Sequence, residues 1–293
     1  MSLRERLYRP PLRPLARRLR PRAAVLVYHR VAETRDDPYG QAVRPDTFAR
    51  HLEAIAREHP VLPLGDLVTA LPRRRYVDGT LAITFDDGYE DNLSAALPIA
   101  ARAGVPMTVF VTVEPVLDGA RFWWDEIAGL EPASRSRMHA RLKALPGGQR
   151  SGRLAAMKLA DGIDRGRPLT LDELRDLAAR PGVEIGAHTL SHPALALLPA
   201  VEQERELTVA RARLEELLGR PVTLLAYPFG KPDDVSEETR NLARRAGYRA
   251  AFTTVAGRLV PSSPLFGLPR LTVHEWPPET LARRLRECLG EPG

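Results

Sequence analysis

From residue 23 onward, short apolar runs alternate with segments in which apolar residues recur at helical spacing. The runs are apolar or β-branched nearly throughout, as in strands buried on both faces of a sheet. They predict strands at 23–28, 81–85, 106–111, 183–187, 222–227, 250–253 and 271–273. The segments between them predict helices at 45–58, 92–103, 171–179, 201–218, 236–246 and 278–289.

Strands that alternate with helices in this way indicate an α/β fold with a parallel sheet and crossover helices. Six or seven such units in one chain favour a barrel over an open sheet. Thr170 and Glu173 form a capping box before one predicted helix. Residues 115–168 depart from the rhythm and contain Phe122-Trp123-Trp124-Asp125, so we expect a helical insertion there.

Composition separates an N-terminal arm from the rest of the chain. Residues 1–22 hold eight arginines against Glu5, whereas the whole chain of 293 residues has a net charge of only +6. We therefore expect an Arg/Pro-rich arm at 1–22 and a single catalytic domain at 23–293. The arm is typical of a solvated tail, and the alternative is peripheral contact with anionic lipid.

Other compositional features narrow the location and the partners. The chain has one cysteine, so no internal disulfide framework is expected. No apolar run resembles an export signal or a transmembrane helix, which predicts a cytoplasmic protein or one at the inner membrane face. Basic and aromatic residues do not interleave beyond the arm, which argues against nucleic-acid binding.

Two adjacent carboxylates, Asp86 and Asp87, end an apolar strand and precede Gly88. The carboxyl ends of parallel strands are where ligands bind in α/β folds. Successive residues that leave a strand point in different directions, so one carboxylate can hold a metal while the other accepts a proton from water. The alternative is a turn or helix-cap pair, because aspartate is common in both.

Another predicted strand, 183–187, ends in the sequence His188-Thr189-Leu190-Ser191-His192-Pro193. The two histidines are four residues apart, so one turn of chain brings both imidazoles to the same side. Two neutral imidazoles with one carboxylate and open positions are typical of a catalytic metal site. The alternative is two unrelated histidines at the surface or in the core.

The segment Thr84-Phe85-Asp86-Asp87-Gly88-Tyr89 and the segment from His188 to Pro193 are identified by their sequence. They resemble the first two motifs of carbohydrate esterase family 4, the polysaccharide deacetylases. The resemblance extends from about Tyr28 to Trp276. It implies a deformed (β/α)7 barrel of the polysaccharide deacetylase type. It further implies Asp87, His188 and His192 as ligands of a divalent metal and Asp86 as the general base.

The third family motif is normally Arg-x-Pro-Tyr or Arg-x-Pro-Phe, and this chain has Ala226-Tyr227-Pro228-Phe229-Gly230. In the family, a backbone N–H at the aromatic position helps to form the oxyanion hole. We therefore place Tyr227, Pro228 and Phe229 at the substrate and oxyanion position. The motif arginine, which steadies the catalytic aspartate in the family, is replaced by Ala226.

Family members also use a histidine as general acid, usually near the C-terminus, where this chain offers His274. The segment Leu26-Val27-Tyr28-His29-Arg30-Val31 instead resembles the first strand of the poly-N-acetylglucosamine deacetylase branch. In that branch the acid histidine comes first and the third motif lacks its arginine. We therefore choose His29 over His274, and expect His51, His59 and His139 to be solvated.

The resemblance predicts a metal-dependent hydrolase that removes N-acetyl groups from a sugar in a polysaccharide, oligosaccharide or glycolipid. The expected metal is Zn²⁺, although Co²⁺, Ni²⁺ or Fe²⁺ suit the same nitrogen and oxygen ligands. Two alternatives stay open: a hydrolase of a small amide, and a glycan-binding protein that kept the fold, which Ala226 favours. Trp123 and Trp124 are either a sugar-stacking wall or part of a core.

Overall fold

The computed structural model describes residues 21–34, 37–157 and 166–291. Within these residues, the main sheet has seven parallel strands in the order β8-β7-β6-β5-β4-β1-β9. The strands are β1 (Ala23–Tyr28), β4 (Thr80–Phe85), β5 (Met107–Val111), β6 (Val183–Ala187), β7 (Leu224–Ala226), β8 (Ala250–Phe252) and β9 (Leu271–Thr272). A separate pair joins β2 (Arg30–Val31) to β3 (Ala42–Val43).

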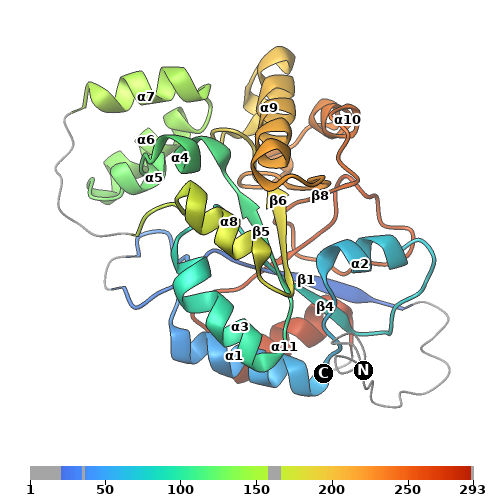
Figure 1. Cartoon of the computed structure of the whole chain (residues 1–293). Coiled ribbons are helices and arrows are strands. Elements are labelled where there is room, and N and C mark those ends of the chain that lie inside the picture. Colours follow the sequence, from blue (N-terminus) through green and yellow to red (C-terminus); the bar gives the residue numbers. More distant parts are fainter. Residues whose placement is uncertain (1–20, 35–36, 158–165, 292–293) are drawn as a thin grey trace.

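Helices surround the curled sheet (Figure 1). Those between and after the strands are α1 (Pro45–Glu58), α2 (Leu64–Ala70), α3 (Leu97–Ala103), α8 (Leu171–Ala179), α9 (Ala200–Leu218), α10 (Glu237–Arg245) and α11 (Pro278–Leu289). Short helical turns are η3 (Asn92–Ala96), η4 (Leu195–Leu197) and η5 (Pro232–Asp234). No described helix combines the length and the apolar composition needed to cross a membrane.

The local predictions agree closely with these elements. The strands predicted at 23–28 and 183–187 and the helices predicted at 45–58, 171–179 and 278–289 are confirmed with the same ends. The capping box at Thr170 and Glu173 is also confirmed. The helix predicted at 92–103 begins with the π-helical turn η3 before α3, and α2 was not predicted.

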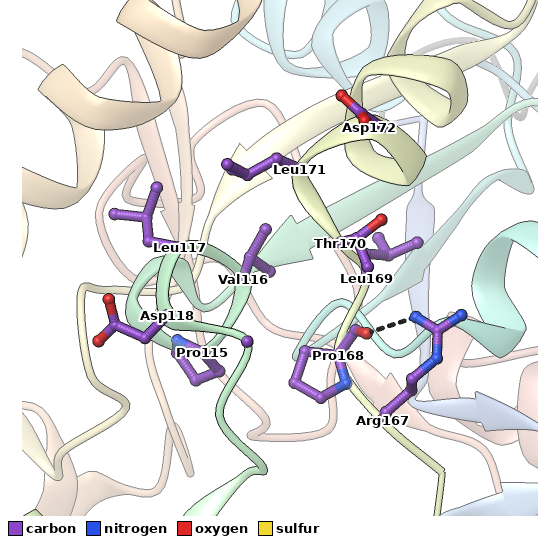
Figure 2. A pocket seen from close by; sticks show the side chains of 11 residues that line it. Pro115, Val116, Leu117, Asp118, Arg167, Pro168, Leu169, Thr170, Leu171 and Asp172 are labelled. Atoms are coloured by element: carbon purple, nitrogen blue, oxygen red, sulfur yellow. Dashed lines mark hydrogen bonds between the residues drawn. The ribbon is translucent and has the colours of Figure 1, made fainter.

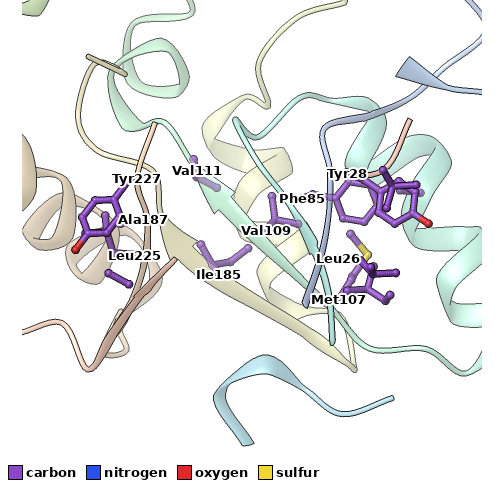
Figure 3. Packing of buried hydrophobic residues seen from close by; sticks show 14 of the residues in the cluster. Leu26, Tyr28, Phe85, Met107, Val109, Val111, Ile185, Ala187, Leu225 and Tyr227 are labelled. Atoms are coloured by element: carbon purple, nitrogen blue, oxygen red, sulfur yellow. The ribbon is translucent and has the colours of Figure 1, made fainter. Parts of the chain in front are cut away.

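Successive side chains of each strand enter two different cores, because both faces of the sheet are buried. Outward-facing side chains such as Leu26 and Phe85 pack with the helices (Figure 3). Side chains on the opposite face, such as Ala82, form a smaller core with α2. This face is crowded, since a Cβ atom at Gly186 would lie 2.4 Å from the ring of Phe110. Only glycine therefore fits at that point of β6.

The segment between β8 and β9 joins the two edges of the sheet. Leu268 pairs with Phe252 of β8, whereas Leu271 of β9 pairs with Leu26 of β1. Arg270 lies between these two pairings, and its backbone N–H donates to the Val255 carbonyl at 3.0 Å. The chain thereby closes the curled sheet into a ring, with Arg270 at the junction.

Between β5 and α8, the described part of the expected insertion folds as four helices: α4 (Val113–Asp118), α5 (Trp123–Glu126), α6 (Pro132–Leu142) and α7 (Gly147–Ala155). Their apolar side chains form a third core with Tyr89. The N-terminal arm expected at 1–22 lies outside the described residues except for its last two positions, of which Arg22 pairs with Asp78 at 2.9 Å.

Two of the histidines that we expected to be solvated are buried, so that expectation is wrong. His51 is 0% exposed, and its Nε2 lies 2.7 Å from the Trp276 carbonyl oxygen. It shares the sheet-facing side of α1 with Phe48, Leu52 and Ile55, three residues at helical spacing. His59 is 9% exposed, and its Nδ1 lies 3.0 Å from the Gly79 carbonyl oxygen.

Candidate active site

The polar residues that follow the strands meet at one edge of the sheet. His29 follows β1, Asp86 and Asp87 follow β4, and His188 follows β6. Because these strands are parallel, their carboxyl ends lie at the same edge. The backbone of Asp87 has a φ of 74°, in the left-handed region. Nε2 of His188 lies 3.5 Å from Asp87 and 4.0 Å from Asp86, whereas the other neighbours of the two carboxylates differ.

Asp87, His188 and His192 form a buried group whose ligand atoms all lie within 4.8 Å of one another. Oδ1 of Asp87 is 3.5 Å from Nε2 of His188 and 3.3 Å from Nε2 of His192. This carboxylate oxygen is buried and has no hydrogen-bond partner among the described atoms. One carboxylate and two imidazoles that converge in this way fit a divalent metal ion.

The protonation states of the imidazoles suit metal binding. Burial lowers the pKa of His188 to about 4, and it lowers the pKa of His192 well below the usual value. Both rings are therefore neutral at pH 7 and carry a free lone pair. Nδ1 of His188 lies 2.8 Å from the Ala226 carbonyl oxygen, which fixes the proton on Nδ1 and leaves Nε2 facing Asp87.

Asp86 faces Arg270, which sequence reasoning did not identify. The guanidinium donates to both carboxylate oxygens of Asp86, at 2.7 Å and 2.6 Å. Burial by itself would raise the pKa of Asp86, but the charges of Arg270 and His188 and the bonds from Arg270 lower it to about 2. Asp86 is therefore an ionised carboxylate held by two hydrogen bonds, and Arg270 provides a guanidinium where Ala226 offers none.

The two candidate acids occupy different places. Burial lowers the pKa of His29, while the charges of Asp87 and Asp86 oppose that shift, so His29 lies within electrostatic reach of both carboxylates. His274 is exposed, and its Nδ1 contacts the Gly40 carbonyl oxygen at 2.8 Å. Of the two, His29 is therefore the candidate acid that interacts with the carboxylate pair.

Comparisons with known proteins bear on the family and the fold of this chain. A family model for polysaccharide deacetylases matches residues 73–251, which is more than half of the chain. The chain belongs to the polysaccharide deacetylase family. YxkH of Bacillus subtilis strain 168, named for the same family, is 22% identical over 191 residues, or 65% of this chain and 50% of the relative. The chain thus spans about half the length of this curated relative.

Solved structures of deacetylases have the same fold. PplD of Streptococcus pyogenes, solved in complex with acetate, is 20% identical and superposes with a TM-score of 0.66 over 90% of this chain and 98% of its own. IcaB from Ammonifex degensii is 18% identical with a TM-score of 0.66, covering 91% of this chain and 97% of its own. At these identities the likeness establishes the fold, and the predicted deformed (β/α)7 barrel is confirmed.

The third motif begins at Ala226, the last residue of β7. The Tyr227 side chain lies in the core that packs with the helices, and its hydroxyl donates to the Phe266 carbonyl at 3.3 Å. The backbone N–H of Tyr227 donates to the Phe252 carbonyl, so neither group faces the site. Phe229 has a φ of 60°, and no acceptor among the described residues receives its N–H. Gly230 allows this turn, because a Cβ there would lie 2.6 Å from the Thr254 nitrogen.

The two tryptophans of the insertion pack against His192. Trp123 and Trp124 are only 5% and 4% exposed, so they belong to the third core and do not present a wall to a sugar. The ring centroid of Trp124 lies 4.3 Å from that of His192. His139, which we expected to be solvated, packs between Trp123 and Phe229, and burial lowers its pKa to about 4.

Two buried side chains hold the loop between His188 and His192. Glu206 of α9 accepts hydrogen bonds from the N–H groups of Leu190 and Ser191 at 3.0 Å and 2.8 Å, and from the Ser191 hydroxyl at 2.6 Å. Arg150 of α7 donates to the Ser191 carbonyl from the other side. Both side chains are buried, at 2% and 3% exposed, so they fix the backbone that carries His192.

A separate pocket of about 450 Å³ lies between α4 and the start of α8 (Figure 2). Its lining includes Pro115, Leu117, Arg167 and Leu171, and none of the candidate catalytic residues. Arg167 donates to the Pro168 carbonyl at 3.1 Å and to the carboxylate of Glu173 at 2.7 Å, so its charge is already paired. We assign this pocket no part in the site.

Proposed function

We propose that the protein is a metal-dependent hydrolase that removes N-acetyl groups from an N-acetylated glycan. The observation that carries the proposal is the separation of the two carboxylates. Asp87 faces two neutral imidazoles, while Asp86 is held ionised by Arg270. A metal ligand and a general base are the two functions that amide hydrolysis requires of such a pair.

Asp87, His188 and His192 would hold the ion, for which Zn²⁺ is the first candidate. When bound, such an ion supplies a Lewis acid that polarises the acetyl carbonyl and makes water more acidic. Asp86 accepts a proton from the water that attacks the carbonyl carbon. The free N–H of Phe229 donates to the oxygen that becomes negative in the tetrahedral intermediate.

We assign the last step, protonation of the leaving group, to His29. In its cationic form it donates a proton to the amide nitrogen as the carbon–nitrogen bond breaks. The products are acetic acid and a free amine on the sugar. The site returns to its starting state when Asp86 releases its proton to solvent and His29 takes one up. Arg270 acts through Asp86, which it orients and keeps ionised, and it does not contact the reacting atoms in this scheme.

Arg270 also bears on the alternatives. The lack of an arginine at Ala226 favoured a glycan-binding protein, and a guanidinium bound to both oxygens of Asp86 removes that reason. A hydrolase of a small amide uses the same residues, so the site does not separate it from a glycan deacetylase. The choice of an N-acetylated glycan rests on membership of the polysaccharide deacetylase family.

The test is acetate release from N-acetylglucosamine oligomers by the metal-loaded protein, compared with the Asp86→Asn variant and with chelated protein. We expect the variant to keep its metal and to lose turnover by a factor of about 10² or more, since it cannot accept the proton. Turnover by Asp86→Asn at the rate of the unchanged protein contradicts the base assignment. Release from a small acetamide but from no oligomer favours the small-amide hydrolase.

A further inference from the structure

Two buried polar residues next to the acidic turn have no part in the mechanism so far. Asp91 and Asn92 follow the Asp86-Asp87 pair by a few positions and are only 8% and 0% exposed. Buried charged and amide groups need partners, because their desolvation otherwise destabilises the fold. The partners of these two residues belong to the segment that begins with His29.

Asp91 and Asn92 hold three consecutive residues of that segment. Nδ2 of Asn92 donates to the carbonyl oxygen of His29 at 2.9 Å. Oδ2 of Asp91 accepts from Nε of Arg30 at 2.9 Å, and Oδ1 accepts from the N–H of Val31 at 3.1 Å. The same Nδ2 lies 3.2 Å from Oδ1 of Asp91, so the two side chains act together. The backbone is thereby fixed directly at His29 and on its C-terminal side.

The guanidinium of Arg30 is itself enclosed. It lies 4.6 Å above the ring of Tyr89. On another side, a Cβ atom at Gly166 would approach its Nη2 to 2.3 Å, so glycine leaves just enough room for it. The hydroxyl of Tyr89 donates to Asp125 at 2.7 Å and accepts from the indole of Trp124 at 2.8 Å. The contacts of Asp91 and Asn92 with the His29 segment are thus connected, through Arg30 and Tyr89, to the third core.

The imidazole of His29 has no such support of its own. Across the described residues, no hydrogen bond reaches either ring nitrogen of His29, whereas His188 is oriented by the Ala226 carbonyl. The place of the ring is therefore set by the backbone from which it projects. A general acid must stand within hydrogen-bond reach of the leaving nitrogen, and a displacement of about 1 Å can reduce the rate about 10²-fold.

We propose that Asp91 and Asn92 are positioning residues for His29, which they hold through its backbone in place of a hydrogen bond to its ring. The inference rests on the proposed function, because it requires His29 to be the general acid. It concerns only the breaking of the carbon–nitrogen bond, in which the proton from His29 goes to the departing amine. Metal binding and the base Asp86 are left unchanged by it.

The experiment compares two substrates in the metal-loaded protein: an N-acetylglucosamine oligomer and 4-nitrophenyl acetate. The oligomer releases an amine that needs a proton, whereas 4-nitrophenolate leaves without one. We expect Asn92→Ala and Asp91→Asn to lose about 10- to 100-fold in kcat on the oligomer with KM unchanged. They should keep ester hydrolysis and metal content, as His29→Ala should. Asp176→Asn, which breaks an exposed pair with Arg180, is the matched control.

The outcomes distinguish the inference from the proposed function. Variants that hydrolyse both substrates at unchanged rates, or that lose both equally while remaining folded, overturn the positioning role. If Asp91→Asn does not fold, Asn92→Ala decides, since it removes the hydrogen bonds of Asn92 to His29 and Asp91 but no charge. If the unchanged protein releases no acetate from any oligomer, the proposed function fails, and the inference fails with it.

Discussion

The pairing of Asp86 with Arg270 gives a prediction whose size follows from the structure. Arg270 is 0% exposed, and its guanidinium donates to Asp86 twice and to the Thr253 carbonyl at 3.0 Å. The variant Arg270→Met removes these bonds and leaves the Asp86 carboxylate buried without its main partner. Removing one partner of a buried ion pair destabilises a fold by about 3–5 kcal/mol.

This loss corresponds to a fall of roughly 6–20 °C in melting temperature, since about 1 kcal/mol lowers the melting temperature by about 2–4 °C in domains of this size. The effect also depends on pH. The pKa of Asp86 is depressed to about 2, so its contribution to stability is present above its ordinary pKa and is lost as the pH falls toward 2. In Arg270→Met, burial raises this pKa instead. The difference in stability between Arg270→Met and the unchanged protein should therefore become smaller as the pH falls and Asp86 of the variant takes up a proton.

The assay is thermal unfolding of the metal-free protein between about pH 5 and pH 8, as a double-mutant cycle with Asp86→Asn. We expect Arg270→Met to destabilise the protein far less in the Asp86→Asn background, because no buried carboxylate is left unpaired there. Arg180→Met, which breaks an exposed pair, serves as control and should change stability by about 1 kcal/mol or less. Additivity of the two site variants to within about 0.5 kcal/mol refutes the reasoning.

Two further predictions concern the metal-ligand group. Glu206→Gln keeps the shape of the side chain but loses the charge that holds Ser191. We therefore expect metal affinity, measured by chelator competition, to fall about 10- to 100-fold. An unchanged affinity contradicts the role given to Glu206. Because burial lowers the pKa values of His188 and His139 to about 4, the unfolded chain binds more protons below pH 6.5. Urea unfolding of metal-free protein should accordingly show stability falling from about pH 6.5 toward pH 4, and a flat profile would be the contrary result.

Residues whose place depends on a strand end could be located from the sequence. Asp86, Asp87 and His188 directly follow apolar strands, and parallel pairing then brings them to one edge. The Tyr227 side chain lies in the core that faces the helices, and the sequence contained a signal for this. Tyr227 stands two residues after Leu225, and both side chains lie in this core. Side chains two positions apart on a strand point to the same face of the sheet.

Arg270 could not be located in this way. It is separated from Asp86 by 184 positions and follows no apolar strand. Its partner depends on how the chain closes the sheet, which hydrophobic periodicity does not encode. His51 is an intermediate case, because its spacing from Phe48 and Ile55 on α1 placed it on the buried face. We nevertheless expected His51 to be solvated, because the residues next to it in the sequence are polar.

The position of Arg270 late in the sequence also has a consequence for the order in which the site is synthesised. The proposed metal ligands Asp87, His188 and His192 all lie within residues 73–251, whereas the partner of Asp86 follows nineteen positions later, at residue 270. During synthesis, the ribosome completes every recognisable motif before it adds the residue that gives Asp86 its charge partner. A fragment that ends with the matched region would contain Asp87, His188 and His192 but would lack Arg270, and with it the charge partner of Asp86. Proteolytic removal of residue 270 and the chain after it should therefore take away this partner while the proposed metal ligands stay in the chain.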